Sequence, residues 1–458
     1  MSRGRKILLS VVVLLAVVLA GAAVYLQPIA PIATGYAAKT VCSAHFVSGR
    51  TVEDAEGDLP ANPLVPLMRT TADDATGTAR TSLLGLWSST AHFTEGLGCT
   101  LAEERPDFAT PPTVEPGDAG ASWPEGEGAA QVSAGVDVDA LDAAIDTAFT
   151  EDDPEGRLRN TRAVVVVRDG ELIAERYGEG FTADTPLLGW SMGKSIANGI
   201  VGRLVGDGDM ALDADGLRPE WADDNRATIT LEHLLTMTSG LSFEEVYDPD
   251  TDATRMLFTP RDTARYAADK ELVSAPGTRW SYSSGTTNIL CDLAQEASGL
   301  DVELAHELVF APLGMASAVI EPDATGTPIC SSFPYATARD WARLGQWFLQ
   351  DGMWDDERLL PEGWVERSTT PVETADADTP YGSQWWLNAG PDGQRRMPSV
   401  PADAYWASGN EGQQVVVVPS EDLVVVRLGF SGGFSGVDWG LEPLLAGIID
   451  ATGGSAES

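Results

Sequence analysis

Residues 189–196 carry the sequence Gly189-Trp190-Ser191-Met192-Gly193-Lys194-Ser195-Ile196, and this stretch decides which fold we expect. It predicts the opening turn of a helix, in which residues three apart share a face, so that Lys194 can reach the hydroxyl of Ser191. Backbone N–H groups and the helix dipole at such a helix start favour negative charge that develops beside the serine. A buried amine has a lowered pKa and can accept the serine's proton.

The scarcity of lysine strengthens this interpretation. The chain has 25 arginines but only four lysines, and the other three are Lys6, Lys39 and Lys270. Arginine can replace lysine in most solubility roles, but it cannot release its proton in a protein. A lysine kept one turn after Ser191 therefore indicates an amine that is needed as a base, and it disfavours the alternative of a helix-capping serine beside a surface lysine.

The same residues also match G-x-S-x-G, the nucleophile elbow of α/β-hydrolases. Three features oppose that alternative. No buried strand leads directly into the motif over Thr182–Leu188, and no histidine follows His306 to complete a triad. The predicted strands also pair as hairpins instead of alternating with helices.

A second candidate, Tyr282, lies in a polar, turn-rich loop before a helix expected over Thr287–Ala297. A phenol near a cationic lysine has a lowered pKa and can move a proton between a serine and a leaving group. A lone tyrosine in a loop is more often a packing residue, so this role depends on Ser191 and Lys194.

A third candidate segment is Gly409-Asn410-Glu411-Gly412-Gln413, just before a valine-rich strand. Glycines there would let the backbone approach a substrate closely. A strand beside the serine could supply one N–H group of an oxyanion hole, from Gln413, with Ser191 supplying the other. The alternative is a plain hairpin turn.

The strand pattern predicts an α+β fold of the α/β-sandwich type. Hairpins are expected from Thr161–Arg168 with Glu171–Tyr177, and from Gln413–Val418 with Leu423–Phe430, which together predict an antiparallel sheet. Helices expected at residues 137–150 and 439–450 would flank it. The long segment between the two hairpins is mainly helix and loop, which predicts an all-helical domain inserted at about residues 206–335.

The N-terminus predicts an anchor or a signal peptide. Three positive charges precede Ile7–Leu26, a stretch of twenty almost entirely apolar residues, which is long enough to cross a bilayer. Ala20-Gly21-Ala22 offers an alternative cleavage site for a removable signal peptide. We favour a retained membrane anchor, and either outcome places the body of the protein outside the cytoplasm.

The expected organisation follows the changes in composition along the chain. We expect an anchor or signal peptide at 1–39, an extracytoplasmic extension at 40–103, an acidic Pro/Gly-rich linker at 104–133, a hydrolase domain at 134–452 and a flexible tail at 453–458.

Charge and cysteine usage restrict the partners. A net charge of −40 argues against binding nucleic acid or anionic membrane surfaces.

Four cysteines in an oxidising compartment predict two disulfides, and of the three possible pairings their grouping favours Cys42–Cys99 with Cys291–Cys330. The cysteine spacings fit no zinc site and the four histidines are scattered, so no metal and no cofactor are expected.

Taken in order, the three motifs resemble those of the serine β-lactamase and penicillin-recognising superfamily, in particular its class C-like branch. That branch includes esterases, D-amino-acid peptidases and 6-aminohexanoate-dimer hydrolases. Residues 229–241, ITLEHLLTMTSGL, are similar to a further signature of the branch, and the resemblance covers about residues 135–450. It implies a β-lactamase/transpeptidase-like fold.

The resemblance also implies roles for individual residues. Ser191 would form an acyl-enzyme, Lys194 and Tyr282 would act together as the base, and the backbone N–H groups of Ser191 and Gln413 would form the oxyanion hole. The substrate-binding positions would be Ser284, Asn410 and Gly412.

Two departures from the pattern bear on the substrate. Class C β-lactamases have asparagine where this chain has Ser284, and Tyr282-Ser283-Ser284 is closer to the 6-aminohexanoate-dimer hydrolases. The third motif usually has lysine or histidine where this chain has Asn410 followed by Glu411. A cation there would help to hold a substrate carboxylate, so its absence weakens a β-lactamase interpretation.

The expected function is therefore an extracytoplasmic serine hydrolase that cleaves small amides or esters, as an amidase or carboxylesterase. Its expected partners are the small-molecule substrate and, through the N-terminal segment alone, a membrane. A true β-lactamase or D-alanyl peptidase is the first alternative. A non-catalytic scaffold that binds cell-wall peptide or antibiotic is the second, and the intact set of Ser191, Lys194 and Tyr282 argues against it.

Overall fold

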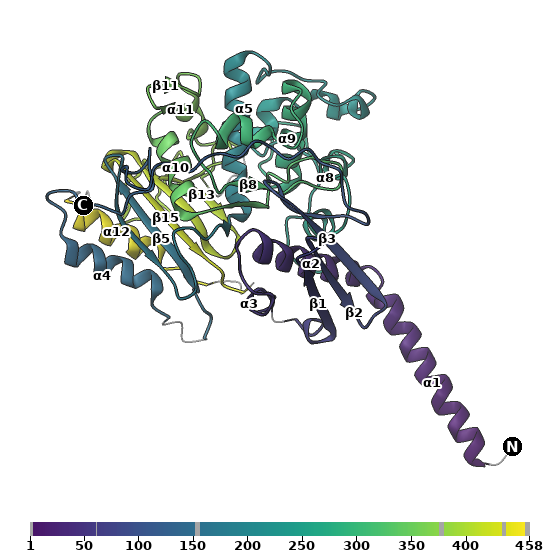
Figure 1. Ribbon diagram of the computed structural model, residues 1–458. Helices are drawn as coiled ribbons and strands as arrows, with labels where there is room; N and C mark the ends of the chain where they lie inside the picture. Colours follow the sequence, from purple (N-terminus) through teal and green to yellow (C-terminus); the bar gives the residue numbers. More distant parts are fainter. Residues whose placement is uncertain (1–2, 61, 152–155, 375–379, 433–436, 454–458) are drawn as a thin grey trace.

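The computed structural model describes residues 3–60, 62–151, 156–374, 380–432 and 437–453. Figure 1 shows a projecting N-terminal helix, a small unit of helix and sheet beside it, and a larger body built around a central sheet. Residues 454–458, most of the expected tail, lie outside the described residues.

The central sheet is antiparallel and has six strands in the order β12-β13-β14-β15-β5-β6. Both predicted hairpins are confirmed, and β5 pairs with β15, which joins the start of the body to its end. The strands are β5 (Thr161–Arg168), β6 (Glu171–Tyr177), β12 (Trp386–Leu387), β13 (Tyr405–Gly409), β14 (Gln413–Val418) and β15 (Leu423–Gly429).

Helices cover both faces of this sheet, which explains why its central strands are continuous runs of valine. Val164 and Val166 of β5 pack into the core under the terminal helices, whereas Val165 and Val167 face the larger core on the other side. Successive side chains of a strand point to opposite faces, so a strand buried on both sides has no polar alternation. The covering helices are α4 (Val138–Phe149) and α12 (Leu441–Ala451) on one face and α10 (Ala338–Leu349) on the other.

The predicted helical insertion is present beside the sheet. It contains α6 (Leu231–Leu235), α7 (Asp252–Phe258), α8 (Thr263–Ala268) and α9 (Ser284–Ser298), and α9 packs on α5 (Gly193–Asp207). The remaining strands and α-helix of the body are β7 (Leu187–Leu188), β8 (Val319–Ile320), β9 (Pro334–Ala336), β10 (Met353–Trp354), β11 (Glu357–Arg358) and α11 (Trp364–Ser368).

The N-terminal extension is a folded unit rather than a loose segment. Helix α2 packs on a four-stranded antiparallel sheet in the order β1-β2-β3-β4. Because α2 begins at Ile29, the boundary expected at residue 39 falls inside this helix. The elements of the extension are α2 (Ile29–Phe46), α3 (Val52–Glu56), β1 (Met68–Asp73), β2 (Thr78–Leu83), β3 (Trp87–Thr94) and β4 (Gly98–Leu101).

Helix α1 (Arg3–Leu26) precedes α2 and points away from the body (Figure 1). Within the described part of the chain, no helix has the combination of length and apolar character that crossing a membrane requires. The membrane anchor stays a prediction.

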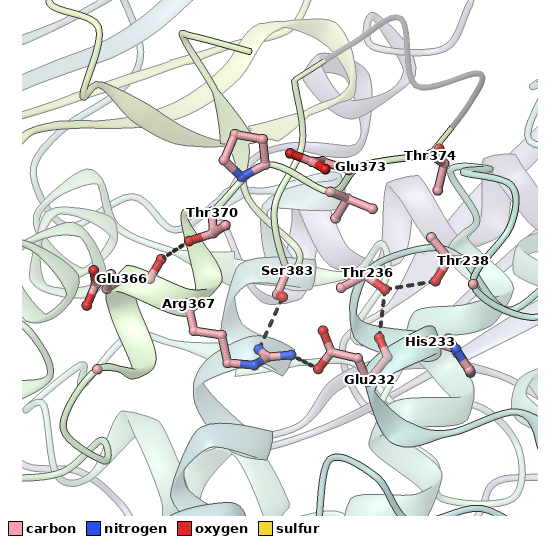
Figure 2. Close-up of a pocket in the computed structure, with 14 residues that line it drawn as sticks. Glu232, His233, Thr236, Thr238, Glu366, Arg367, Thr370, Glu373, Thr374 and Ser383 are labelled. Carbon is pink, nitrogen blue, oxygen red and sulfur yellow. Dashed lines mark hydrogen bonds and ion pairs between the residues drawn. The ribbon is translucent and has the colours of Figure 1, made fainter. Parts of the chain in front are cut away.

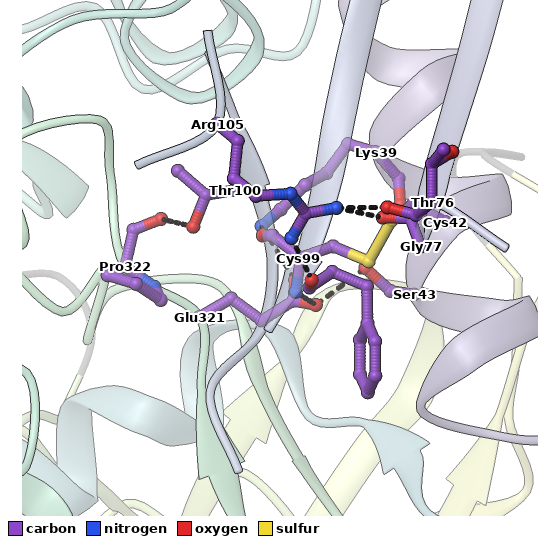
Figure 3. Close-up of a disulfide and its surroundings, with 11 residues drawn as sticks. Lys39, Cys42, Ser43, Thr76, Gly77, Cys99, Thr100, Arg105, Glu321 and Pro322 are labelled. Atoms are coloured by element: carbon purple, nitrogen blue, oxygen red, sulfur yellow. Dashed lines mark hydrogen bonds and ion pairs between the residues drawn. A yellow bond between two sulfur atoms is a disulfide. The ribbon is translucent and has the colours of Figure 1, made fainter. Parts of the chain in front are cut away.

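Both predicted disulfides are confirmed, Cys42–Cys99 in the extension and Cys291–Cys330 in the body. The first lies beside a buried ion pair, in which the Nζ of Lys39 is 2.7 Å from the Oε2 of Glu321 (Figure 3). The other oxygen of Glu321 accepts hydrogen bonds from the Ser43 hydroxyl and from the backbone N–H of Cys99, each at 2.7 Å. Glu321 belongs to the body and Lys39 to α2, so this cluster fastens the extension to the body.

The segment expected to be an acidic Pro/Gly-rich linker is partly packed against the body. The side chain of Trp123 is buried, and Arg343 of α10 donates hydrogen bonds to the carbonyl oxygen of Pro124 and to the carboxylate of Glu127. The Pro/Gly-rich composition gave no sign of this contact, because it depends on an arginine more than 200 residues away in the sequence.

We predict that Lys39→Met lowers the free energy of unfolding by about 3–5 kcal/mol, because it leaves the Glu321 carboxylate buried without its cation. The double variant Lys39→Met/Glu321→Leu should recover most of this loss. The measurement is urea denaturation of the full chain.

Lys270→Met is the matched control, since Lys270 pairs with Asp252 at a partly exposed site. It should cost about 1 kcal/mol or less. Equal losses for the two lysine variants would contradict the structural role given to Lys39.

Candidate active site

Ser191 lies in a tight 3₁₀ turn, η2 (Trp190–Met192), that leads directly into α5. Both glycines of the motif are needed for close packing. A Cβ atom on Gly193 would overlap the carbonyl oxygen of Cys330, and one on Gly189 would overlap the ring of Trp341. Trp190 has φ +48°, a left-handed conformation that is costly for a bulky residue and is found at functional sites.

Lys194 is brought to the serine as the sequence predicts. Its Nζ donates hydrogen bonds to the Oγ of Ser191 at 3.0 Å, to the Oγ of Ser284 at 3.0 Å and to the carbonyl oxygen of Ser331 at 3.1 Å. Among the described residues, no carboxylate forms an ion pair with it, in contrast to Lys39 and Lys270. Burial lowers the pKa of Lys194 to about 8, against the opposing effect of the Glu245 carboxylate. A substantial fraction of this amine is therefore neutral near pH 8.

Tyr282 also lies at the site, with the Lys194 Nζ 4.7 Å from the centre of its ring. Its hydroxyl contacts Ser191 and Trp386. The expectation of a lowered pKa is wrong, because burial raises the pKa of this phenol above its usual range and outweighs those contacts. Tyr282 therefore holds its proton at neutral pH and is suited to donate it.

Ser284 is turned toward the lysine. Its side chain is fully buried, accepts from Lys194 and donates from Oγ to the Oε1 of Glu245 at 2.5 Å. The backbone N–H of Ser284 donates to the other oxygen of Glu245 at 2.7 Å. The hydroxyl thus connects the amine to a carboxylate, and the predicted contact of Ser284 with substrate remains a prediction.

Glu245 was missed by the sequence analysis. It lies in a loop of the helical insertion, beside a second glutamate, in a chain with 69 acidic residues. Only the fold brings it to Ser284, so no local pattern could have identified it.

The third motif lies against the nucleophile turn. Gly409, at the end of β13, approaches Gly189 so closely that a Cβ atom would overlap the Gly189 carbonyl oxygen. Gln413 begins β14, and its side chain is held by the backbone of Gly429, whose N–H donates to Oε1 at 3.1 Å. The segment is therefore placed beside Ser191, and the oxyanion role of the Gln413 N–H remains a prediction.

Gly412 and Asn410 have different surroundings. Gly412 has φ +90°, a backbone conformation that favours glycine. Its carbonyl oxygen accepts a hydrogen bond from the buried guanidinium of Arg427 at 2.7 Å. The structure therefore explains why a glycine occupies this position. Asn410 is exposed and lines a cavity of about 550 Å³, together with Trp190 and Tyr247. Contact of either residue with substrate remains a prediction.

A separate cavity of about 540 Å³ lies between α6 and α11 (Figure 2). Arg367 forms an ion pair with Glu232 there and donates to the Ser383 hydroxyl at 3.2 Å. His233 lines this cavity, and its Nδ1 accepts a hydrogen bond from the Thr230 backbone N–H at the start of α6. Within the described ranges, none of the predicted catalytic residues lines this cavity and no group of three or more His, Cys, Asp or Glu residues could hold a metal ion.

Known proteins with similar sequences are hydrolases. A 6-aminohexanoate-dimer hydrolase from Paenarthrobacter ureafaciens is 29% identical over 303 residues, which cover 60% of this chain and 74% of the relative. Esterase EstB from Burkholderia gladioli is 32% identical over 39% of this chain and 52% of its own length. A D-aminopeptidase from Brucella canis is 27% identical over 48% of each chain. The chain thus spans only about half the length of the last two relatives.

Solved structures show the same fold. A putative 6-aminohexanoate-dimer hydrolase from Bacillus anthracis aligns with a TM-score of 0.54 and 24% identity, over 64% of this chain and 79% of that protein. A putative β-lactamase from Bacteroides dorei aligns with a TM-score of 0.55 and 20% identity, over 69% and 98%. The model of the Beta-lactamase family matches residues 148–431, which is more than half of the chain. The chain therefore belongs to the Beta-lactamase family and is a serine hydrolase of that family.

Proposed function

We propose that this protein hydrolyses small amides or esters through an acyl-enzyme on Ser191, as an amidase or carboxylesterase rather than as a β-lactamase. The observation that carries the proposal is the hydrogen bond between Ser191 and a buried lysine whose pKa is about 8. A base whose pKa lies near the working pH is the most effective.

In the first step, neutral Lys194 takes the proton of the Ser191 hydroxyl while Oγ attacks the substrate carbonyl carbon. The charge that develops on the carbonyl oxygen is stabilised by the backbone N–H groups of Ser191 and Gln413. As the bond to the leaving group breaks, Tyr282 donates its proton to the departing oxygen or nitrogen, and the lysine ammonium reprotonates the phenolate. The products are an acyl-Ser191 ester and a free alcohol or amine.

In the second step, water attacks the acyl-Ser191 ester. Neutral Lys194, acting with Tyr282, removes a proton from the water, and the Ser191 oxygen leaves and regains a proton from the same pair. The carboxylic acid departs and the resting site is restored. Glu245 holds Ser284, which in turn holds the amine, so both residues act as positioning residues.

The surroundings of the site support an amidase or esterase over a β-lactamase. Asn410 and Glu411 occupy the place where a cation would hold a substrate carboxylate, and Glu411 adds negative charge. The similarity to the 6-aminohexanoate-dimer hydrolase and to esterase EstB supports the same choice. We also place the protein outside the cytoplasm, a proposal supported by its two disulfides.

Covalent labelling of the purified protein tests the proposal directly. A fluorophosphonate should label Ser191, as located by peptide mass, and a reporter penicillin offered in parallel should not. Labelling by both reagents would favour the penicillin-recognising alternative, and no label on Ser191 would favour a non-catalytic scaffold.

Removing the lysine base should lower activity without unfolding the protein. We expect Ser191→Ala to abolish hydrolysis of p-nitrophenyl acetate and Lys194→Arg to reduce it by about 10²–10⁴-fold, the range for a general base, because arginine keeps the charge but cannot accept the proton. Turnover rates, with melting temperatures as the control for folding, provide the measurement. Near-normal turnover by Lys194→Arg would exclude the amine as the base.

The pH dependence should follow the lysine. The ammonium form of Lys194 is inactive as a base and the neutral amine is active, so kcat/KM should rise with pH through a midpoint of about 8. Initial rates across pH 6–10, corrected for spontaneous ester hydrolysis, measure this midpoint.

Glu245→Gln should move this midpoint to lower pH. The carboxylate raises the pKa of Lys194, so its loss makes the amine easier to deprotonate. Glu244→Gln is the matched control, because the neighbouring side chain is exposed and should leave the midpoint unchanged. Equal midpoints in the two variants would show that Glu245 has no effect on the lysine.

A further inference from the structure

The cavity of about 550 Å³ beside Asn410 is built by two parts of the chain that are distant in sequence. One wall comes from the extension, where α2 and the short turn η1 (Val65–Leu67) contribute side chains that are mostly apolar. The opposite wall comes from the body. Its volume lies within the roughly 300–1,000 Å³ that is typical of small-molecule sites. The residues contributed by the extension include Ile29, Ile32, Ala33, Tyr36, Leu64 and Val65.

This cavity lies beside the catalytic residues, although none of Ser191, Lys194 and Tyr282 lines it. Trp190, the neighbour of Ser191, lines it and packs edge-to-face on Tyr247, with ring centres 5.8 Å apart. Tyr247 also lines the cavity, and its hydroxyl contacts Ser284, the residue that holds Lys194. A chain attached to a carbonyl carbon at Ser191 would therefore have to pass these two rings to enter the cavity.

The geometry distinguishes the two halves of a substrate. Tyr282, the proton donor for the leaving group, is not among the described residues that line the cavity. Its ring instead lies among Trp280, Tyr381 and Trp386. The leaving group is therefore expected on the Tyr282 side, which leaves the side of Trp190 and the cavity for the acyl chain.

The lining also selects the chemistry of the occupant. Apolar side chains from the extension face Phe258 and Pro249 of the body, and burying a methylene group among such side chains is favourable. The charged groups that line the cavity are the carboxylates of Asp248 and Glu411, which disfavour an anionic chain. Asn410 and Glu411 lie where the third motif meets the cavity.

We infer that this cavity is the acyl-chain site, and that the N-terminal extension selects substrates with an unbranched, uncharged, apolar acyl chain such as octanoyl. The inference rests on the proposed function, since the chain must be delivered to Ser191. The wall that the extension contributes to the cavity is held rigidly, because α2 is fixed by the Cys42–Cys99 disulfide and by the Lys39–Glu321 pair.

The test compares p-nitrophenyl octanoate with p-nitrophenyl acetate, using the full chain. In the unmodified protein, kcat/KM for the octanoate should exceed that for the acetate by about tenfold or more, because six additional methylene groups are buried. Ala33→Trp and, independently, Val65→Trp fill the cavity from the extension and should lower the octanoate-to-acetate ratio by about tenfold.

Leu67→Trp is the matched control. Leu67 belongs to the same turn as Val65, is 49% exposed and does not line the cavity. The octanoate-to-acetate ratio of this variant should therefore equal that of the unmodified protein. Melting temperatures identify any variant that fails to fold.

The outcomes separate the inference from the proposed function. If the acetate is hydrolysed but both cavity-filling variants keep the octanoate preference, or the unmodified protein has none, the acyl-chain site is refuted. If neither ester is hydrolysed, the proposed function fails, and calorimetry of p-nitrophenyl octanoate binding then decides the inference. Binding that Ala33→Trp abolishes and Leu67→Trp retains supports the site, and absent or unaffected binding overturns it.

Discussion

The chemistry that we propose for this protein depends on one buried amine. Lys194 is enclosed by two hydroxyls and a carbonyl oxygen, and none of these can neutralise its charge. Taking an ammonium group out of water is costly unless a carboxylate compensates for its charge. Burial therefore favours the neutral amine of Lys194 over its ammonium form, and the pKa falls to about 8. The Glu245 carboxylate, which accepts from Ser284, is close enough for its charge to limit this fall. The amine is thus kept as a usable base instead of becoming half of an ion pair.

The fold holds that amine in place through contacts that tolerate little change. Gly193 lets the start of α5 approach the Cys330 carbonyl, and the next residue along, Ser331, supplies the third partner of Lys194. The Cys291–Cys330 disulfide fixes this segment to α9, the helix that Ser284 begins. Gly409 brings β13 against the same turn from the sheet. Helix, disulfide and sheet therefore converge on Ser191.

Much of this could be predicted from sequence, because the signals were local. Both hairpins could be predicted from their strand-forming runs, and Ser191 and Lys194 were found because three-residue spacing fixes a helix face. The role of Glu245, the Lys39–Glu321 pair and the packing of Trp123 could not be predicted, because each depends on contacts between distant segments. The predicted direction of the Tyr282 pKa shift was wrong because the burial of the phenol, which raises its pKa, was left out.

The scarcity of lysine alone could not separate structural from chemical roles. Lys39 is as deeply buried as Lys194, and burial lowers the pKa of both. The difference lies in the partner, since Glu321 faces Lys39 directly and opposes that fall, whereas Lys194 faces hydroxyls. A paired buried lysine fixes two units of structure together, and an unpaired one is available to exchange a proton. The extension and the catalytic site thus each contain a buried lysine, and the position of a carboxylate decides whether that lysine forms an ion pair or can exchange a proton.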